Sequence, residues 1–294
     1  MCATLNNVNT EAIPAPRSWQ NFDARAGQRL DEFLFAALPE VSRQGIRRLI
    51  AHGFVTVDSQ ARTAGYRLKT AQCIQVPDGL ERFSVAPEDL PITVLFEDDS
   101  MIAIDKPSGM LAHPTSQERS GTAVNAIMGH LKGARPSLIH RLDRGTSGVL
   151  LAAKTEEAAR ELGALFETRQ IDKRYLAVLA SEPAWTQLEV DAPIERYKDG
   201  RTPKWNTGEN GAEALTKLTK LRGRLIQAEP FTGRTNQIRI HCASIGLPIL
   251  GDVAYGGPLA ERMFLHAHEL EFLSGPYAGL TICADSSATD LKMD

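Results

Sequence analysis

Apolar residues in the first part of the chain recur at the spacing of amphipathic helices. One stripe runs from Leu30 to Leu38, with apolar side chains three or four positions apart, and a second runs from Ser42 to Gly53. Ser42 is expected to cap the second helix and Gly53 to end it, and two short apolar strands follow. This pattern predicts a small module, which we place at residues 21–83.

The rest of the chain combines short apolar runs with two helical patterns. Thr122–Leu131 and Thr155–Thr168 are expected to be helices, each opened by a threonine cap. The many strand-like runs between and after them predict an α+β fold class for residues 92–283. Strands are expected at 94–96, 101–104, 137–139, 149–152, 175–179, 214–220 and 225–228.

Three further segments complete the expected domain organisation. Residues 84–91 contain two prolines and two acidic residues, which is typical of a linker. Residues 1–20 are polar and are expected to be an amino-terminal tail, and residues 284–294 a carboxy-terminal tail. The length of 294 residues fits one large domain with a small companion.

Composition limits the class of protein further. A hydrophobic fraction of 43% with 23% charged residues is typical of a globular chain. The longest apolar runs are about five residues, whereas a helix needs roughly 20 to cross a bilayer, so no membrane partner is expected. The first 18 residues lack the apolar stretch of a secretion signal, and the four cysteines lie far apart. We therefore expect a cytoplasmic chain without a zinc site or disulfide framework.

The net charge of −3 does not by itself indicate a nucleic-acid-binding protein, but the basic residues are unevenly distributed. Between Ser42 and Lys69 there are six basic residues and one acidic residue. Arg43, Arg47 and Arg48 fall together on the face of the second helix opposite its apolar stripe, where they suit contacts with phosphates. An ordinary solvated helix face is the alternative interpretation of the same charges.

Two polar segments of the large domain carry candidate chemistry. His140–Gly148 places Asp143 between two arginines on a loop, which taken alone is typical of a surface salt bridge. Thr232–His241 alternates basic and apolar residues, as a half-buried strand with inward cations would. Together they suggest one carboxylate held ionised by a buried guanidinium. An ionised aspartate without a second carboxylate or a metal suits a nucleophile.

Other familiar chemistries lack their motifs. The chain has no glycine-rich phosphate-binding or dinucleotide-binding motif and no nucleophile elbow. His266 and His268 are the closest approach to a metal pair, but no third or fourth ligand is evident, and we expect a structural role for them.

The segment His140-Arg-Leu-Asp-x-x-Thr-Ser-Gly148 resembles the signature of the RluA-type pseudouridine synthases. The order of residues from Arg29 to Val57 resembles the αL-type RNA-binding module of certain ribosomal proteins and tRNA synthetases. Further segments similar to those of the synthase family follow in the family's order: Lys106-Pro-x-Gly109 with His113-Pro114, Lys173-Arg-Tyr-x-Ala-Val178, Thr232-Gly-Arg-Thr-x-Gln-Ile-Arg239, Gly246-x-Pro-Ile249 with Gly251-Asp252 and Tyr255-Gly256, and Leu265-His-Ala267.

The resemblance implies an enzyme that detaches uracil from its ribose, rotates it and rejoins it through carbon, after the uridine has left its stack. It implies a mixed, largely antiparallel catalytic sheet and no cofactor or metal. Asp143 would be the nucleophile, Tyr175 would stack on the uracil, and Arg239 would keep Asp143 anionic. Substrate-binding roles are implied for Ile238 beneath the site, Arg141 in the space left by the flipped nucleotide, and Lys106, Arg144 and Arg234 at phosphates.

Three positions depart from the family pattern. Asn236 stands where a histidine is usual, Asp105 where an asparagine is usual, and Asp58-Ser59 where a turn of Asn-Gly is usual, so a different turn is expected there. The polar stretch Tyr197–Asn210 is expected to be a mobile loop that could order on RNA.

The expected function is isomerisation of uridine to pseudouridine in structured RNA by a monomer. Large-subunit ribosomal RNA is favoured over tRNA, because the αL-type module accompanies that group of synthases. Two alternatives remain open from the sequence. One is a catalytically silent RNA-binding factor of ribosome assembly, and the other is a hydrolase that cleaves the glycosidic bond without rejoining it.

Overall fold

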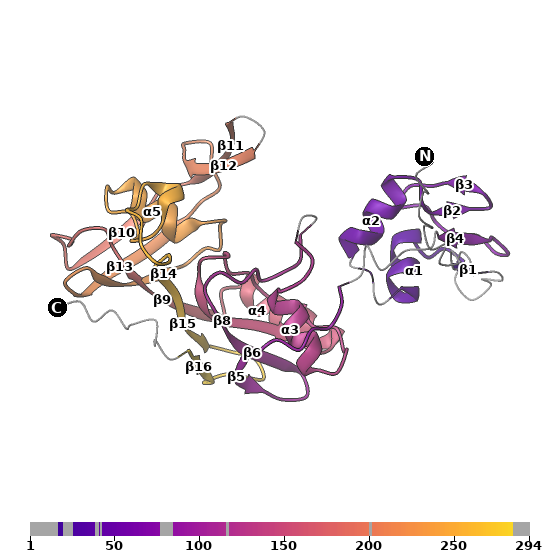
Figure 1. The fold of residues 1–294 in the computed structure, drawn as a ribbon, viewed down its shortest axis with the longest axis horizontal. Helices are drawn as coiled ribbons and strands as arrows, with labels where there is room; N and C mark the ends of the chain where they lie inside the picture. Colours follow the sequence, from indigo (N-terminus) through magenta and orange to yellow (C-terminus); the bar gives the residue numbers. More distant parts are fainter. Residues whose placement is uncertain are drawn as a thin grey trace, which may run out of the picture. The chain divides into compact units, whose positions relative to one another are not determined.

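A computed structural model describes residues 17–19, 26–38, 41, 43–76, 85–115, 118–199 and 202–284. Its described residues divide into two compact units, one ending at Ala86 and the other beginning at Pro87. Figure 1 labels the helices and strands of both units along the ribbon. None of the helices in these ranges is long and apolar enough to cross a membrane.

The amino-terminal unit packs two helices against a small antiparallel sheet. Helix α1 buries one apolar stripe and α2 another, so that both share a single core with the sheet. The strands lie in the order β1-β4-β2-β3, and the pairing of β1 with β4 was not predicted from the sequence. The expected cap Ser42 lies outside the described residues. The elements are β1 (Arg17–Trp19), α1 (Leu30–Ala37), α2 (Arg43–Ala51), β2 (Thr56–Val57), β3 (Gln60–Ala61) and β4 (Ile74–Val76).

A two-residue turn joins β2 to β3. Asp58 and Ser59 both have positive φ, at 50° and 62°, as a type I′ hairpin turn requires. The carboxylate of Asp58 accepts hydrogen bonds from the backbone N–H of Cys73 and the side chain of Gln72, both at 2.8 Å. These bonds stabilise the left-handed backbone, so Asp58-Ser59 forms a tight two-residue turn without Asn-Gly.

The carboxy-terminal unit is built on a sheet of ten strands. Its main path runs β10-β13-β14-β9-β15-β8-β6-β5, with β16 paired to β15 and β7 to β8. Among the strands described, β8 and β15 are the one parallel pair, which agrees with the expected mixed, largely antiparallel sheet. The strands are β5 (Thr93–Glu97), β6 (Met101–Lys106), β7 (Ser137–Leu138), β8 (Ser147–Ala153), β9 (Ile171–Val178), β10 (Gln187–Asp191), β13 (Leu215–Arg222), β14 (Leu225–Pro230), β15 (Leu265–Phe272) and β16 (Thr281–Cys283).

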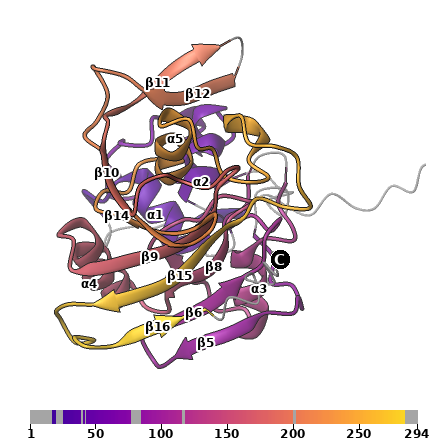
Figure 2. The ribbon, with the colours of Figure 1, turned by 90° about the vertical axis from the view of Figure 1, so that its left-hand side faces the viewer.

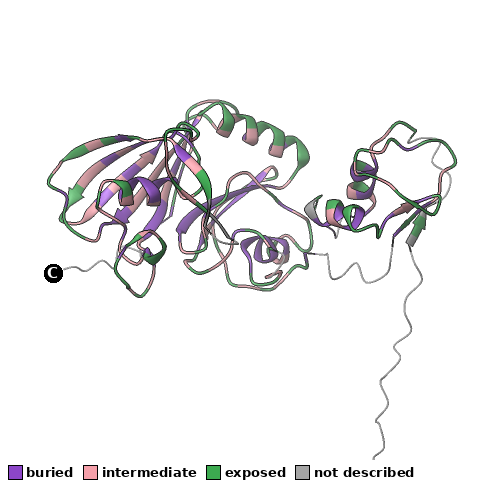
Figure 3. Ribbon diagram, turned by 90° about the horizontal axis from the view of Figure 1, so that it is seen from above, coloured by how far each residue is buried: buried purple, intermediate pink, exposed green. Residues whose placement is uncertain are grey.

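Helices cover the sheet and bury its central strands. The side chains of Thr122 and Thr155 cap α3 (Ala123–His130) and α4 (Glu156–Glu167). Helix α3 packs on one cluster of sheet residues and α4 on another, so β8 is buried along its whole length. Figure 3 shows this burial in the central strands.

Two parts of this unit differ from the expectation. The segment 232–241 is not a strand: it is a loop followed by helix α5 (Gln237–Ser244), because Gln237 and His241 are polar yet buried against β13. The stretch expected as a mobile loop lies largely in an antiparallel hairpin of β11 (Ile194–Asp199) and β12 (Thr202–Thr207). Figure 2 shows the hairpin beside α5.

One row of paired residues crosses the sheet from β6 to β14. Lys106 pairs with Gly148, Gly148 with Ala267, Ala267 with Tyr175 and Tyr175 with Ala228. Paired residues of neighbouring strands share a face of the sheet. Gly148 has a φ of +108°, and a Cβ atom there would overlap with the backbone carbonyl of Ala267. The approach of β15 to β8 therefore requires glycine at position 148.

We expect Gly148→Ala to lower the free energy of unfolding by about 2–4 kcal/mol, because it adds backbone strain and overpacking. Urea denaturation of wild type and variant measures the loss. Gly279→Ala is the matched control, since Gly279 has a φ of +84° but open space around its Cβ position. The free energy of unfolding of Gly279→Ala should fall only by the part that comes from backbone strain, without the part that comes from overpacking. Equal losses in the two variants would contradict the close-approach argument.

Candidate active site

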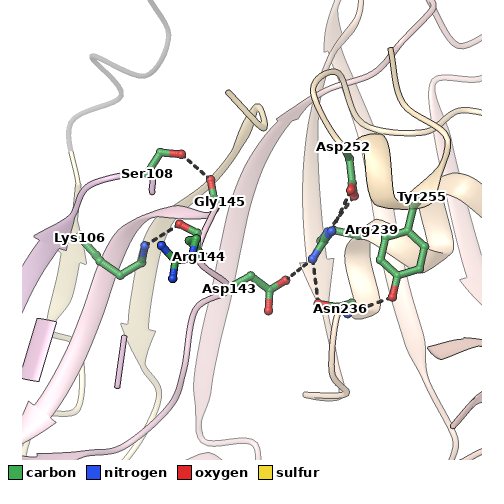
Figure 4. Close-up of polar contacts among 9 residues, drawn as sticks. All are labelled: Lys106, Ser108, Asp143, Arg144, Gly145, Asn236, Arg239, Asp252 and Tyr255. Atoms are coloured by element: carbon green, nitrogen blue, oxygen red, sulfur yellow. Dashed lines mark hydrogen bonds and ion pairs between the residues drawn. The ribbon is translucent and has the colours of Figure 1, made fainter. Parts of the chain in front are cut away.

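Asp143 lies on the loop that connects β7 to β8. A hydrogen bond from the backbone N–H of Thr146 to the carbonyl of Asp143, at 3.1 Å, closes the loop. The carbonyl of Arg144 accepts from the N–H of Gly109 at 2.8 Å, and that of Gly145 accepts from the hydroxyl of Ser108 at 2.7 Å. The backbone that follows Asp143 is thus held by residues 108 and 109, and Figure 4 shows the bond from Ser108 to Gly145.

Arg239 on α5 meets this carboxylate from the other side of the site. Its Nη1 lies 3.0 Å from Oδ2 of Asp143. The Asp143 side chain is 34% exposed and the Arg239 side chain 14%. The carboxylate can therefore be reached by a substrate, whereas the guanidinium is mostly enclosed by protein.

The remaining donors of Arg239 are also occupied. Nε and Nη2 donate to the two oxygens of Asp252 at 2.7 and 2.8 Å, and Nη1 also donates to Asn236 at 2.9 Å. The guanidinium lies over the ring of Tyr255, with 4.9 Å from Cζ to the ring centre. Burial lowers the pKa of Arg239, but the hydrogen bond to Asp252 and the charges of Asp143 and Asp252 outweigh it, and the pKa is raised. Arg239 is a permanent cation here.

Buried polar contacts explain why α5 begins where it does. The side chain of Gln237 donates to the carbonyl of Leu215 and to the hydroxyl of Thr216, both at 2.9 Å. Its carbonyl oxygen accepts from the hydroxyl of Thr232 at 2.6 Å. Asn236, just before the helix, has a φ of 58°. These bonds fasten the start of α5 to β13 and direct Arg239 toward Asp143.

Tyr175 is half-buried in β9 and packs on two hydrophobic clusters at once. Its neighbours in the row across the sheet are Ala228 and Ala267, both with small side chains. Burial raises the pKa of Tyr175, and the negative charge of Asp143 raises it further. The hydroxyl is therefore protonated at neutral pH and lies within electrostatic range of Asp143.

Lys106 is fully buried at the end of β6. Its Nζ donates to the carbonyls of Pro107, Met110 and Arg144 at 2.9, 2.8 and 3.3 Å. Burial lowers the pKa of Lys106 to about 8, although the charge of Asp143 opposes this shift. An ammonium enclosed by carbonyls does not fit the phosphate contact expected from the sequence, and it instead ties the loop of Asp143 to β6.

The other expected substrate-binding residues lie at different depths. Ile238 is 6% exposed and packs beneath the site. Arg141, Arg144 and Arg234 are exposed. Arg144 forms an ion pair with Glu118, and Nε of Arg234 donates to the carbonyl of Glu213 at 2.9 Å. These three arginines are accessible to a polyanion, in contrast to Lys106.

In the amino-terminal unit, Arg43 and Arg47 are exposed and Arg48 is half-buried on α2. The Arg43 guanidinium lies over the Phe35 ring at 3.8 Å, and Arg47 lies 3.8 Å from Asp31. Asp31 also accepts two hydrogen bonds from Arg29. The basic face is therefore organised by contacts inside its own unit.

The side chains of His140, His266 and His268 take part in hydrogen bonds within the fold. His266 bonds to the hydroxyl of Ser147 at 2.9 Å, and His268 bonds to the carbonyl of Ala284 at 3.0 Å. Burial lowers the pKa of His140 to about 3, and its ring nitrogen accepts from the N–H of Leu151. Within the described part of the chain, no group of three or more potential ligands could hold a metal.

Comparison with known proteins shows the family to which the chain belongs. The sequence model described as RNA pseudouridylate synthase matches residues 100–244, and the S4 domain model matches residues 28–72. A protein of Aquifex aeolicus, named an uncharacterized RNA pseudouridine synthase, is 36% identical over 78% of this chain and 77% of its own length. The chain belongs to the RNA pseudouridine synthase family.

Two further matches extend this result. Ribosomal large subunit pseudouridine synthase D of Zymomonas mobilis is 34% identical, over 88% of this chain and 90% of its own length. The solved structure of human RNA Pseudouridylate Synthase Domain Containing 4 is 26% identical, with a TM-score of 0.53 over 66% of this chain and 88% of that one. This pseudouridine synthase is therefore an isomerase acting on RNA, with an S4 domain at its amino-terminal end.

The structure adds site residues of the pseudouridine synthase that the sequence did not single out. Asp252, Asn236 and Tyr255 all contact Arg239. Asp252 and Tyr255 belong to a segment that resembles the family, but the sequence assigns no role to either residue. Asn236 differs from the histidine that is usual in the family at that position. Their part in the site depends on contacts to α5, which no local pattern shows.

The pKa of Lys106 makes a testable prediction about stability and pH. With a pKa lowered from 10.5 to about 8, folded Lys106 loses its proton at a lower pH than the unfolded chain does. The unfolded state then binds more protons between about pH 8 and 10, so stability rises with pH in this window. The free energy of unfolding of wild type, relative to Lys106→Met, should increase from pH 8 to 10 and stay constant below pH 7. A pH-independent difference would show that Lys106 keeps an ordinary pKa.

Proposed function

We propose that Asp143 is the nucleophile of this synthase and acts on a uridine flipped out of structured RNA, most favourably large-subunit ribosomal RNA. The ion pair between Asp143 and Arg239 carries the proposal. It places a permanent cation 3.0 Å from a partly exposed carboxylate, with no second carboxylate in contact with Asp143 among the described residues. An anionic, accessible oxygen is what covalent catalysis requires.

The reaction needs no oxidant or reductant. The N1–C1′ bond of the uridine breaks and its electron pair leaves with the uracil, while Asp143 forms a temporary bond to the sugar or to the base. After the base rotates, C5 bonds to C1′ and the bond to Asp143 breaks. The C5 proton is released to water, and N1, which kept the electron pair of the broken bond, takes up a proton from water. Bonds formed and broken balance, so the product is an isomer of the substrate.

The residues around Asp143 suit the accompanying steps. We assign to Tyr175 the stacking on the uracil, and its protonated hydroxyl is placed to assist removal of the C5 proton. Ile238 supports the site from below, and Arg239 forms an ion pair with Asp143. Because the uridine must leave its stack, a side chain is needed in the vacated space, and exposed Arg141 is the candidate.

RNA binding is shared between exposed arginines. Arg144 and Arg234 are accessible near the site and suit phosphates, whereas Lys106 supports the loop. We propose that residues 21–83 form the RNA-binding module, joined by the linker 84–91 to a catalytic domain at 92–283. The relatives from Zymomonas mobilis and Nitrosomonas europaea are named as ribosomal large subunit pseudouridine synthase D, which supports ribosomal RNA as the substrate class. A cytoplasmic monomer is the simplest form of such an enzyme.

Replacing the nucleophile should abolish catalysis without abolishing binding. We expect Asp143→Asn to lower the release of tritium from C5-labelled ribosomal RNA by at least about a thousandfold, since no other group can form the temporary bond. RNA affinity, measured by filter binding, should stay within about threefold of wild type, because phosphate contacts dominate it.

The same assay distinguishes the alternatives. An RNA-binding assembly factor would release no tritium in either form while binding RNA equally well. A glycosidic-bond hydrolase would release free uracil from wild type. Tritium release that persists in Asp143→Asn would contradict the assignment of the nucleophile.

The basic face of α2 makes a separate prediction. The variant in which Arg43, Arg47 and Arg48 are all replaced by Ala should bind RNA more weakly. In a plot of the logarithm of the binding constant against the logarithm of the salt concentration, the magnitude of its slope should be smaller by about 2 to 3. The rate of a single turnover at saturating RNA should not change, because these residues lie outside the catalytic domain.

The matched control removes the same charge from the same unit. Arg62, Arg67 and Lys69 are replaced together by Ala; Arg62 already contacts Gln60, and Arg67 donates to the carbonyl of Gly27. A smaller change in salt dependence is expected for this control. Equal changes in both triple variants would mean that net charge, and not the face of α2, determines binding.

A further inference from the structure

The buried carboxylate of Asp252 has no part in the chemistry proposed above, yet it makes the most extensive contact with Arg239. It accepts from both Nε and Nη2, whereas Asp143 accepts from Nη1 alone. The Asp252 side chain is 1% exposed, compared with 34% for Asp143. Asp143 can be reached by RNA, and Asp252 cannot.

We infer that Asp252 is a positioning residue, which fixes the guanidinium of Arg239 so that only Nη1 faces the Asp143 carboxylate. The inference rests on the proposed roles of Asp143 and Arg239. It deepens that proposal by naming the group that sets the orientation and the charge of Arg239.

The geometry of a guanidinium explains the orientation. Its donors form a rigid planar fork, and a carboxylate that binds Nε and Nη2 together fixes the direction of the plane. The ring of Tyr255 covers one face of that plane, and the Tyr255 hydroxyl accepts from the side-chain amide of Asn236 at 2.9 Å. Nη1 is left to bond with Asp143 and Asn236.

The backbone around Asp252 holds the carboxylate in place. Its N–H donates to the carbonyl of Ile249 at 3.1 Å, and its carbonyl accepts from the N–H of Gly257 at 2.8 Å. Gly251 has a φ of +81°, and a Cβ atom there would overlap with the carbonyl of Arg262. This turn is packed from both sides, so Asp252 is a fixed reference point for Arg239.

The charges explain why this matters for reaction. Arg239 is one cation between two carboxylates, and the excess negative charge lies at the more exposed of them, Asp143. Without Asp252, the edge of the guanidinium formed by Nε and Nη2 would be free to turn toward Asp143. It could then bind both carboxylate oxygens of Asp143. An oxygen tied in such a bidentate pair is a weaker nucleophile, and a guanidinium that turns away no longer supports the carboxylate. Either change lowers the rate of the chemical step.

The test is the variant Asp252→Asn. Asparagine has the same side-chain shape as aspartate, but its NH2 group replaces one acceptor oxygen and faces the N–H donors of Arg239. We expect kcat for tritium release to fall by about 10- to 100-fold, the scale of a misplaced catalytic group. The KM for RNA should stay within about twofold, because Asp252 is buried.

A double-mutant cycle shows whether the loss acts through Arg239. In an Arg239→Lys background, which has no fork to orient, Asp252→Asn should lower kcat by less than about threefold. Equal factors in the two backgrounds would overturn the inference, as would a wild-type kcat in Asp252→Asn or a loss that appears only in KM.

Controls separate positioning from folding. Asp98 accepts two backbone N–H groups at 2.8 Å and the Tyr277 hydroxyl at 2.7 Å, so Asp98→Asn should lose stability but keep kcat. If Asp252→Asn does not fold, Asp252→Glu replaces it, because this variant keeps the negative charge but moves the carboxylate oxygens. Asp252→Glu should also lower kcat and leave KM unchanged. A wild-type kcat in this variant would overturn the inference. Absence of tritium release by wild type would instead contradict the proposed function.

Discussion

The close approach of β8 and β15 is the constraint on which the rest of the site depends. Where these parallel strands meet, Gly148 lies against the backbone of Ala267, and no larger residue fits. The pairing continues from Ala267 to Tyr175 on β9, while β8 itself begins just after the loop that carries Asp143. One backbone contact therefore brings the strand that follows the Asp143 loop into the same row as Tyr175. The other side of the row ends at Lys106, which holds the Asp143 loop from behind.

Two buried cations serve this site in opposite ways because their partners differ. Arg239 faces two carboxylates, so its pKa is raised and it remains a fixed positive charge for Asp143. Lys106 faces backbone carbonyls, whose dipoles do not fully replace the lost hydration, so burial lowers its pKa to about 8. A guanidinium between carboxylates can maintain an anion, whereas an ammonium among carbonyls can fasten a loop. Both residues are cations in the sequence, and their different partners in the fold give them these different roles.

The parts of the fold with regular apolar periodicity could be predicted from the sequence, including the capped helices that begin after Thr122 and Thr155. The segment 232–241 could not, because its buried residues include Gln237 and His241. Both reach Thr216 on β13, and the sequence does not show that a distant strand will satisfy a polar side chain. The hairpin of β11 and β12 was missed for a related reason: its polar residues are typical of loops, and its pairing depends on register rather than on local propensity.

For the candidate site, the sequence singles out residues but does not show how they are connected. Asp143, Tyr175 and Arg239 stand in recognisable segments, but Asp252 gains its importance from a contact with α5 that only the fold creates.

The same limit applies to the net charge of the chain. A net charge of −3 argues against RNA binding only if the acidic residues are free to repel phosphates. Asp31 and Asp252 are each paired with arginines, and Glu97 is paired with Lys154. Acidic residues used in this way organise the basic side chains, so formal charge says less about an RNA-binding surface than the partners of each carboxylate do.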